Sequence, residues 1–168
     1  RKRDSITFAT ATAAFRAVRT LGCRSMHIGG GEPFLAVDAL MQALSAARAE
    51  RMGIDYIETN ASWFKDEASA RELLREVRHQ GCDTLLVSID PFHNAFIPFH
   101  KVRGTMEACR RAGMSVFPWR LEFQGEIERF DDTQTHRLAD YEEAYGPGYL
   151  RDLESRYGVN LGGRALTT

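Results

Sequence analysis

The sequence predicts an α/β protein built on parallel strands, and two observations carry the prediction. Short apolar runs alternate with amphipathic stretches at a period of about thirty residues, the size of a βα unit. Glycines precede the apolar runs, at Gly22, Gly53, Gly81 and Gly113, where a helix C-terminus favours a left-handed residue. Parallel strands joined by helices form either part of a (β/α) barrel or an open doubly wound sheet, and the pattern leaves both open.

The elements follow in chain order. The apolar runs predict strands at 25–28, 55–57, 84–89 and 115–119. Stripes of apolar residues at helical spacing predict helices that bury one face, over 14–21, 37–47, 70–77 and 102–109. Further helices are predicted from Asp131 to Tyr145 and, after the Gly146-Pro-Gly148 break, at 149–157. We therefore divide the chain into a core, 1–124, and a helical extension or remainder of the barrel, 125–168.

Composition limits the classes of function. The chain has 168 residues and a formal net charge of -1, which argues against a nucleic-acid surface held by charge. It has no apolar run long enough for a bilayer and no signal peptide, so we expect a cytoplasmic protein. The three cysteines, Cys23, Cys82 and Cys109, are an odd number at wide spacing, and we expect small buried thiols in a reduced compartment. Neither end resembles a natural terminus, so we expect a fragment.

Polar groups follow every predicted strand, where parallel sheets place their functional residues. Each has an ordinary explanation, since Asn60 and Asp90 are good caps and Arg120 can pair with a nearby glutamate. Their joint placement at one edge favours a ligand site. The glycines after the first strand let a ligand approach the bare backbone. In chain order the groups are Gly29 to Pro33, Glu58 to Asn60, Ser88, Asp90 with His93, and Arg120 with Glu122.

One segment of this edge resembles a known family. Gly30-Gly31-Glu32-Pro33 after a strand resembles the GGEP motif of radical S-adenosylmethionine (radical SAM) enzymes. The Thr59-Asn60 pair, the run Leu86 to Asp90 followed by Pro91-Phe92-His93, and the glycine entry at Gly113 are similar to later parts of that family. The resemblance covers about residues 5–122, with a weaker match at 163–166. It implies a partial TIM-like (β/α) barrel, a truncated radical SAM core.

The resemblance also implies a cofactor and its contacts. In the family the GGEP loop contacts the amino group of S-adenosylmethionine, so Glu32 and the backbone of Gly30 and Gly31 are expected to accept its ammonium. Arg120 is the best partner for the cofactor carboxylate, because a guanidinium presents a two-pronged donor face. His93 is either a capping residue or a group that meets substrate. The expected cofactor-binding set is Gly30, Gly31, Glu32, Pro33, Thr59, Asn60, Ser88, Asp90 and Arg120.

One family feature is absent. The CxxxCxxC loop that holds the [4Fe-4S] cluster does not occur in the chain, and Cys23 and Cys82 start strands at the edge opposite the predicted site. We expect the cluster ligands upstream of Arg1 in a longer protein. That protein would accept electrons from a donor such as a flavodoxin or ferredoxin and form a 5′-deoxyadenosyl radical that abstracts hydrogen from an unknown substrate. This fragment alone is expected to be inactive.

Two alternatives remain open. The first is a non-catalytic domain or scaffold that binds S-adenosylmethionine or a nucleotide and has lost the cluster. The second is a metal-dependent TIM-barrel hydrolase that uses His27, His93 or His100 together with Glu32 and Asp90. The second is less favoured, because His27 lies inside a strand and the three histidines lack ligand spacing.

Overall fold

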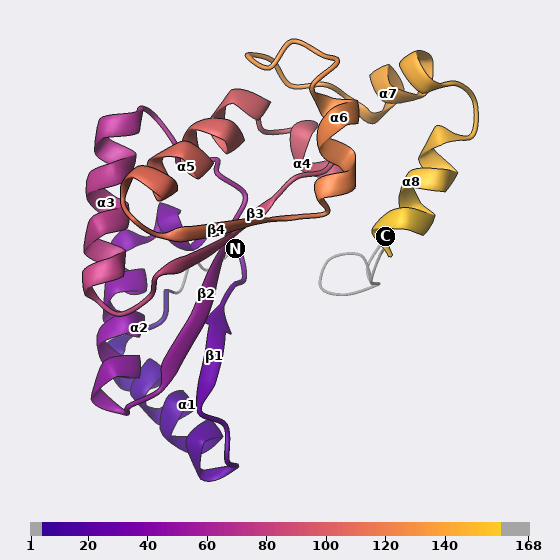
Figure 1. Cartoon of the computed structure of the whole chain (residues 1–168). Helices are drawn as coiled ribbons and strands as arrows, with labels where there is room; N and C mark the ends of the chain where they lie inside the picture. Colours follow the sequence, from indigo (N-terminus) through magenta and orange to yellow (C-terminus); the bar gives the residue numbers. More distant parts are fainter. Residues whose placement is uncertain (1–4, 159–168) are drawn as a thin grey trace.

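Four parallel strands form one sheet in the computed structural model, which describes residues 5–158 (Figure 1). Each strand pairs with the next one along the chain, so the order is β1-β2-β3-β4. All four predicted strands are confirmed, with the second longer than expected. Their bounds are β1 Ser25–Ile28, β2 Gly53–Thr59, β3 Thr84–Ser88 and β4 Ser115–Trp119.

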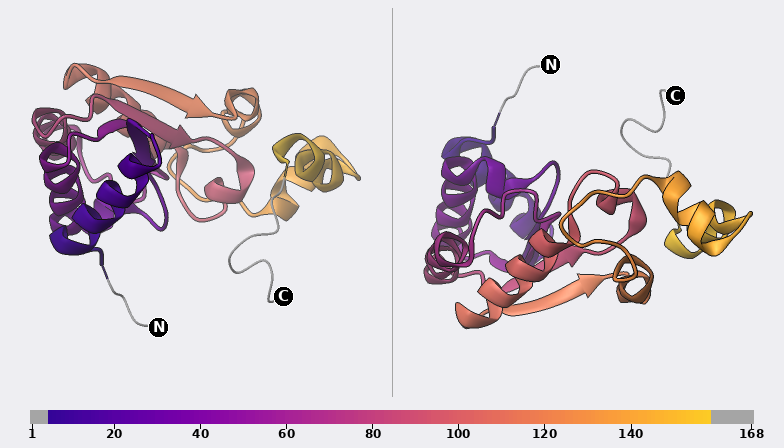
Figure 2. Two further views of the ribbon diagram at one scale, coloured as in Figure 1. Left: turned by 90° about the horizontal axis from the view of Figure 1, so that it is seen from below. Right: turned by 90° about the horizontal axis from the view of Figure 1, so that it is seen from above.

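The long helices lie together on one side of the sheet (Figures 1 and 2). They are α1 Phe8–Thr20, α2 Val37–Ala49, α3 Glu67–His79 and α5 Phe99–Arg111. Shorter elements follow the strand ends or make up the C-terminal segment. They are the 3-10 helices η1 Pro33–Leu35 and η2 Leu121–Phe123 and the helices α4 Pro91–Asn94, α6 Gln124–Ile127, α7 Leu138–Tyr145 and α8 Tyr149–Tyr157.

The strand order decides how the sheet is wound. A doubly wound sheet needs a point where the strand order reverses, and the described strands contain no such reversal. Because successive right-handed crossovers in one direction place all helices on the same face, the sheet is singly wound. The α/β class is thereby confirmed, as an open four-stranded parallel sheet with helices on one face.

The two faces of the sheet differ in burial. Leu85 and Val87 of β3 face the helices and have no exposed surface. On the opposite face, Glu58 lies beside Leu86, which lies beside Phe117 of β4, and Phe117 is 39% exposed. Tyr56 meets the edge of Phe117 on this face, with ring centroids 5.5 Å apart. The core therefore lies between the sheet and the helices, while the other face is largely open.

Only three of the four glycines that precede strands adopt the left-handed conformation predicted for a helix C-terminus. Gly22, Gly81 and Gly113 adopt positive φ after α1, α3 and α5, as expected of helix C-termini. After α2 the left-handed residue is Arg51, with φ 53°, rather than Gly53. Gly53 instead lets β2 approach β1, because a Cβ there would lie 3.1 Å from the Cβ of Ser25.

Three other expectations are wrong. Leu21 follows the end of α1 and is 83% exposed, because the helix stops before the stripe returns to the core. Cys23 is exposed, whereas Cys82 and Cys109 are buried as predicted. The helix expected from Asp131 begins only at Leu138. Asp131 instead closes a turn, since its Oδ1 accepts hydrogen bonds from the backbone N–H and the hydroxyl of Thr133.

The C-terminal helices share the core of the sheet rather than forming one of their own. Tyr141 of α7 is fully buried and donates a 2.6 Å hydrogen bond to Asn94 Oδ1 in α4. Tyr149 and Leu153 of α8 belong to the same hydrophobic cluster. The predicted division at 124/125 falls at the start of α6 and stays a prediction, and the GRA match at 163–166 lies outside the described residues. No helix within 5–158 has the length and hydrophobicity that a membrane span needs.

Gly104 of α5 gives a test of the packing between α5 and the loop after β2. A Cβ at Gly104 would lie 2.3 Å from the ring of Phe64, which is itself buried. Gly104→Ala should therefore lower the free energy of unfolding by about 1–3 kcal/mol, measured by urea denaturation. The matched control is Gly125→Ala in α6, where a Cβ meets nothing within 4 Å. Equal stability of the two variants would contradict the packing.

Candidate functional site

The loop after β1 presents bare backbone at the edge of the sheet. Gly30 and Gly31 adopt positive φ, at 87° and 64°, and both are exposed. A Cβ added to either would meet no described atom within 4 Å, so the space above the loop is open. Gly29 differs, because a Cβ there would lie 2.7 Å from Glu58 Oε2. The loop thus combines two conformationally necessary glycines with one that allows a carboxylate to lie against the backbone.

Glu32 joins this loop to the end of β2. Its Oε1 accepts hydrogen bonds from the Thr59 hydroxyl, at 2.9 Å, and from the Phe34 N–H, at 3.2 Å. Its Oε2 accepts the backbone N–H of Asn60, at 2.7 Å. Pro33 opens η1 directly after it. The structure therefore brings the predicted residues Glu32, Thr59 and Asn60 together, around one carboxylate that bridges two strands.

Thr59 and Asn60 are held by further hydrogen bonds. The Thr59 hydroxyl accepts the indole N–H of Trp63 at 2.9 Å and the backbone N–H of Ala61 at 3.1 Å. The Asn60 side chain accepts the backbone N–H of Ser62, which is the capping role that the sequence allows for it. These contacts rigidify the β2 end, and within residues 5–158 the Asn60 amide nitrogen donates no hydrogen bond.

Burial dominates the electrostatics of Glu32. Removal of its carboxylate from water raises the pKa of Glu32, although the hydrogen bonds from Asn60, Thr59 and Phe34 and the charge of His93 all act to lower it. A partly desolvated carboxylate gains more from a cationic ligand than an exposed one, because water screens their attraction less.

Asp90 and His93 form a pair at the end of β3. Asp90 caps α4, with Oδ1 accepting the His93 backbone N–H at 2.9 Å, and Oδ2 lies 2.7 Å from His93 Nδ1. The Asp90 side chain is fully buried, whereas that of His93 is 34% exposed. Burial alone would lower the pKa of His93, but the hydrogen bond and charge of Asp90, with the charge of Glu32, raise it. The capping interpretation of Asp90 is confirmed, and its pairing orients His93.

Ser88 lies next to a small internal cavity. The cavity has a volume of about 10 Å³, the room that about one water molecule occupies, and Asp90 and His93 also line it. Ser88 thus lies with the Asp90–His93 pair at the end of β3.

Arg120 follows β4, as predicted, but another element already holds it. Its Nη2 donates a 2.7 Å hydrogen bond to the carbonyl of Tyr157 at the end of α8. Its Cζ lies 5.3 Å from the ring centroid of Trp119 and 5.8 Å from that of Tyr157. Its Nη1 lies 3.6 Å from Glu122, the neighbour suggested by the sequence. The guanidinium is therefore at the predicted edge, under the last turn of α8.

The sequence places Glu58 at this edge without giving it a cofactor contact, and it gives no signal for Tyr157. Glu58 lies against Gly29, with Oε1 3.5 Å from His27 Nε2. The alternation of strand side chains gives this signal, since Glu58 must face away from Thr59. Tyr157 comes from 37 residues beyond Arg120, and no local pattern predicts that contact.

The described residues offer no metal centre. Among residues 5–158, no three histidine, cysteine, aspartate or glutamate side chains come together in a way that could hold a metal ion. Burial raises the pKa of Cys82 and raises that of Cys109 to about 12, which disfavours the thiolates that iron needs. His27, His93 and His100 therefore do not form the site of a metal-dependent hydrolase within this part of the chain.

Comparison with known proteins does not extend the resemblance. No model of a known protein family and no curated protein sequence matches the chain. The geometry of the strand ends therefore carries the functional argument.

Thr59 is the first test of this geometry. Thr59→Val removes the donor to Glu32 and the acceptor of two N–H groups, one from Trp63 and one from Ala61. We expect the free energy of unfolding to fall by about 2 kcal/mol in urea denaturation, because buried polar groups lose their partners. Thr59→Ser keeps the hydroxyl, so its free energy of unfolding should fall by less than about half of that amount. A valine variant as stable as the serine variant would contradict the network.

His93 gives a test with a defined pH dependence. Its folded pKa is raised above the ordinary value of 6.5, so the protonated ring stabilises the fold. The stability of the wild type relative to His93→Gln should be greatest below pH 6.5 and should fall as pH rises through the folded pKa. Urea denaturation of both proteins at a series of pH values measures this difference in the free energy of unfolding. His79→Gln, on the exposed end of α3, is the control, and an identical pH dependence there would reject the role of Asp90.

Proposed function

We propose that the strand-end site binds S-adenosylmethionine, and that the chain is the part of a radical SAM enzyme that holds this cofactor. The observation that carries the proposal is the β1 loop. Exposed, left-handed Gly30 and Gly31 leave open space beside the buried carboxylate of Glu32, in a sequence that resembles the GGEP motif. A ligand with an ammonium group fits a loop of bare carbonyls next to such a carboxylate.

The balance of charge around the site supports the same ligand. Three carboxyl groups, Glu32, Glu58 and Asp90, lie at the strand ends or beside them, together with the imidazole of His93 and the guanidinium of Arg120. S-adenosylmethionine carries two positive groups, its ammonium and its sulfonium, and one carboxylate. The carboxylates therefore suit the positive groups, while Arg120 supplies a partner for the negative one.

The winding of the sheet agrees with a partial (β/α) barrel. Such a barrel has its strands in sequential order and its helices outside, and its ligands bind at the carboxyl ends of the strands. The singly wound order and the open inner face of Tyr56, Glu58 and Phe117 are what one part of that architecture has. We propose that the sheet is such a part, and that this open face turns toward the inside of the barrel.

The described residues do not fit the iron–sulfur cluster. Cys23 is exposed before β1, Cys82 and Cys109 are buried, and the three do not come together. Within residues 5–158 the cysteines therefore supply no ligand set for the cluster that the reductive cleavage of S-adenosylmethionine needs. What the described residues can do is bind the cofactor and orient its amino acid and ribose parts.

A second function has one observation in its favour. A domain that binds S-adenosylmethionine or a nucleotide without catalysis needs no cluster, and the described residues hold none together. Anaerobic reconstitution of the full-length protein with iron and sulfide separates the two functions. A stable cluster supports the enzyme, and failure to form one supports the non-catalytic domain.

Arg120 tests the binding proposal directly. Arg120→Ala should weaken S-adenosylmethionine binding about tenfold, because a charge-assisted hydrogen bond to the carboxylate is lost. 5′-Methylthioadenosine has no amino acid part, so its affinity should change much less. Equilibrium dialysis of both ligands measures the difference.

The control for this experiment is Arg111→Ala. Arg111 pairs with Glu67 and Glu107 on the helical side and lies away from the strand ends. No binding of S-adenosylmethionine by the wild-type chain would reject the proposed function, and equal losses for Arg120→Ala and Arg111→Ala would reject the carboxylate assignment.

A further inference from the structure

The last turn of α8 lies over the ends of β3 and β4. The Tyr157 carbonyl accepts the hydrogen bond from Arg120, and the Tyr157 ring meets the ring of Phe92 edge-on at 5.1 Å. Burial raises the pKa of Tyr157 to about 12. One residue of the expected cofactor site, Arg120, is therefore held by the last turn of this helix.

The ends of β1 and β2 differ from this covered half. Gly30 and Gly31 are exposed, and a Cβ at either would meet no described atom within 4 Å. A ligand could reach the glycine loop in the present arrangement, but it could bind Arg120 Nη2 only after the Tyr157 carbonyl releases it. The site is thus half open and half covered.

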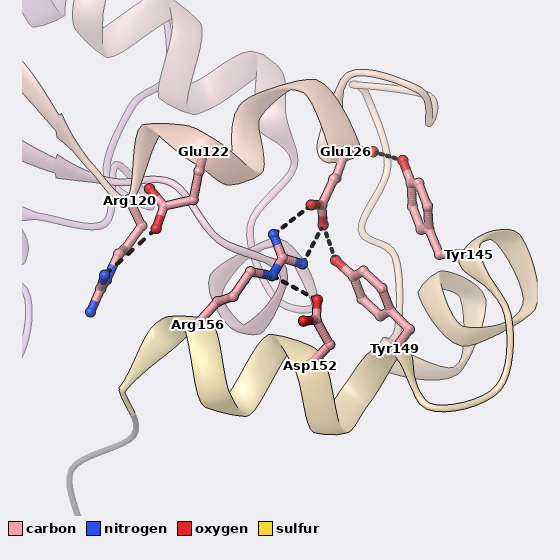
Figure 3. A network of polar contacts seen from close by, with 7 residues as sticks. All are labelled: Arg120, Glu122, Glu126, Tyr145, Tyr149, Asp152 and Arg156. Atoms are coloured by element: carbon pink, nitrogen blue, oxygen red, sulfur yellow. Dashed lines mark hydrogen bonds and ion pairs between the residues drawn. The ribbon is translucent and has the colours of Figure 1, made fainter.

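The position of α8 depends on one carboxylate in α6 (Figure 3). Arg156 Nη1 lies 2.7 Å from Glu126 Oε1, and Nη2 lies 3.3 Å from Oε2. The Tyr149 hydroxyl donates to the same carboxylate. Arg156 also pairs with Asp152 at 2.7 Å and stacks over Phe123, with Cζ 4.6 Å from the ring centroid. Arg156 therefore fixes α8 at the residue just before Tyr157.

Arg120 is incompletely satisfied in this covered arrangement. Its backbone is left-handed, with φ 64° and ψ 51°, a conformation that favours glycine. Its Nε is buried and has no hydrogen-bond partner among the described residues. The guanidinium thus keeps an unused buried donor while the Tyr157 carbonyl holds one arm, and a carboxylate would satisfy more of its donors than one carbonyl does.

We propose that the last turn of α8 is a displaceable cover that competes with the cofactor for Arg120. This inference rests on the proposed function, and it assigns a regulatory role to the Glu126–Arg156 pair. The apparent affinity for the cofactor is its intrinsic affinity multiplied by the fraction of molecules in which α8 is displaced. Weakening the pair therefore tightens binding, and by linkage the bound cofactor loosens α8.

Arg156→Ala tests the cover on the whole chain. Loss of the ion pair should raise the affinity for S-adenosylmethionine about fivefold in equilibrium dialysis, the size expected from one partly exposed pair with good geometry. Arg151→Ala is the matched control, because Arg151 is an exposed arginine of the same helix outside the Glu126 network. Tyr149→Phe removes only one hydroxyl from Glu126 and should act in the same direction more weakly, even if Arg156→Ala fails to fold.

Hydrogen exchange gives a readout that a purely structural role of Arg156 would not move. S-adenosylmethionine should speed the exchange of the α8 amides, residues 149–157, in the wild type. Slower or unchanged exchange of these amides in the presence of S-adenosylmethionine would contradict the proposal that α8 is a displaceable cover.

The outcomes separate this inference from the proposed function. Equal affinity in the wild type, Arg156→Ala and Arg151→Ala overturns the cover and leaves the binding function standing. Weaker binding by Arg156→Ala would show that α8 helps to form the binding site. That result would also contradict the proposal that α8 competes with the cofactor. Absence of binding in every variant rejects the proposed function, and the cover with it.

Discussion

The carboxylate of Glu32 is the interaction on which the site depends. It accepts hydrogen bonds from the loop after β1 and from the first residues beyond β2, and so ties two strand ends that the chain separates by 27 residues. Burial raises the pKa of this carboxyl, and its three hydrogen-bond donors offset part of that effect. The same three bonds fix the direction in which the glycine loop presents its backbone. Under the proposed function, the structure of the loop and the binding of the ligand therefore use one side chain, and a change that weakens either weakens both.

The sequence predicts those parts of the molecule that depend on local pattern. The strands, the helical stripes and the cap at Asp90 each follow from residues within one or two turns of one another, and all of them occur. The failures have local causes too. Leu21 continues the apolar spacing but lies beyond the last turn of α1, and Asp131 has the residue type of a helix cap but closes a turn with Thr133. Periodicity indicates which face is apolar, and it does not indicate where a helix stops.

Contacts between distant segments are the part that sequence reasoning could not reach. The joining of Glu32 to Thr59 and Asn60 follows once the strands are known to be parallel, because their carboxyl ends meet. The approach of Tyr157 to Arg120 does not, since it depends on the path of α6, α7 and α8, and on tyrosines that pack on one another rather than on a strand. The structure adds that Tyr157 also reaches the polar edge.

The sequential order of the strands has a consequence for how the chain folds. Every strand pairs with the one before it, so each step closes only a helix-sized loop, and the sheet can grow one βα unit at a time. Helix α8 makes its polar contacts over similar separations, 30 residues from Arg156 to Glu126 and 37 from Tyr157 to Arg120. It pairs with no strand of the sheet, although its Tyr149 and Leu153 are buried in the core. A movement of its last turn alone would therefore break no strand pair, and it would be a local opening of the molecule.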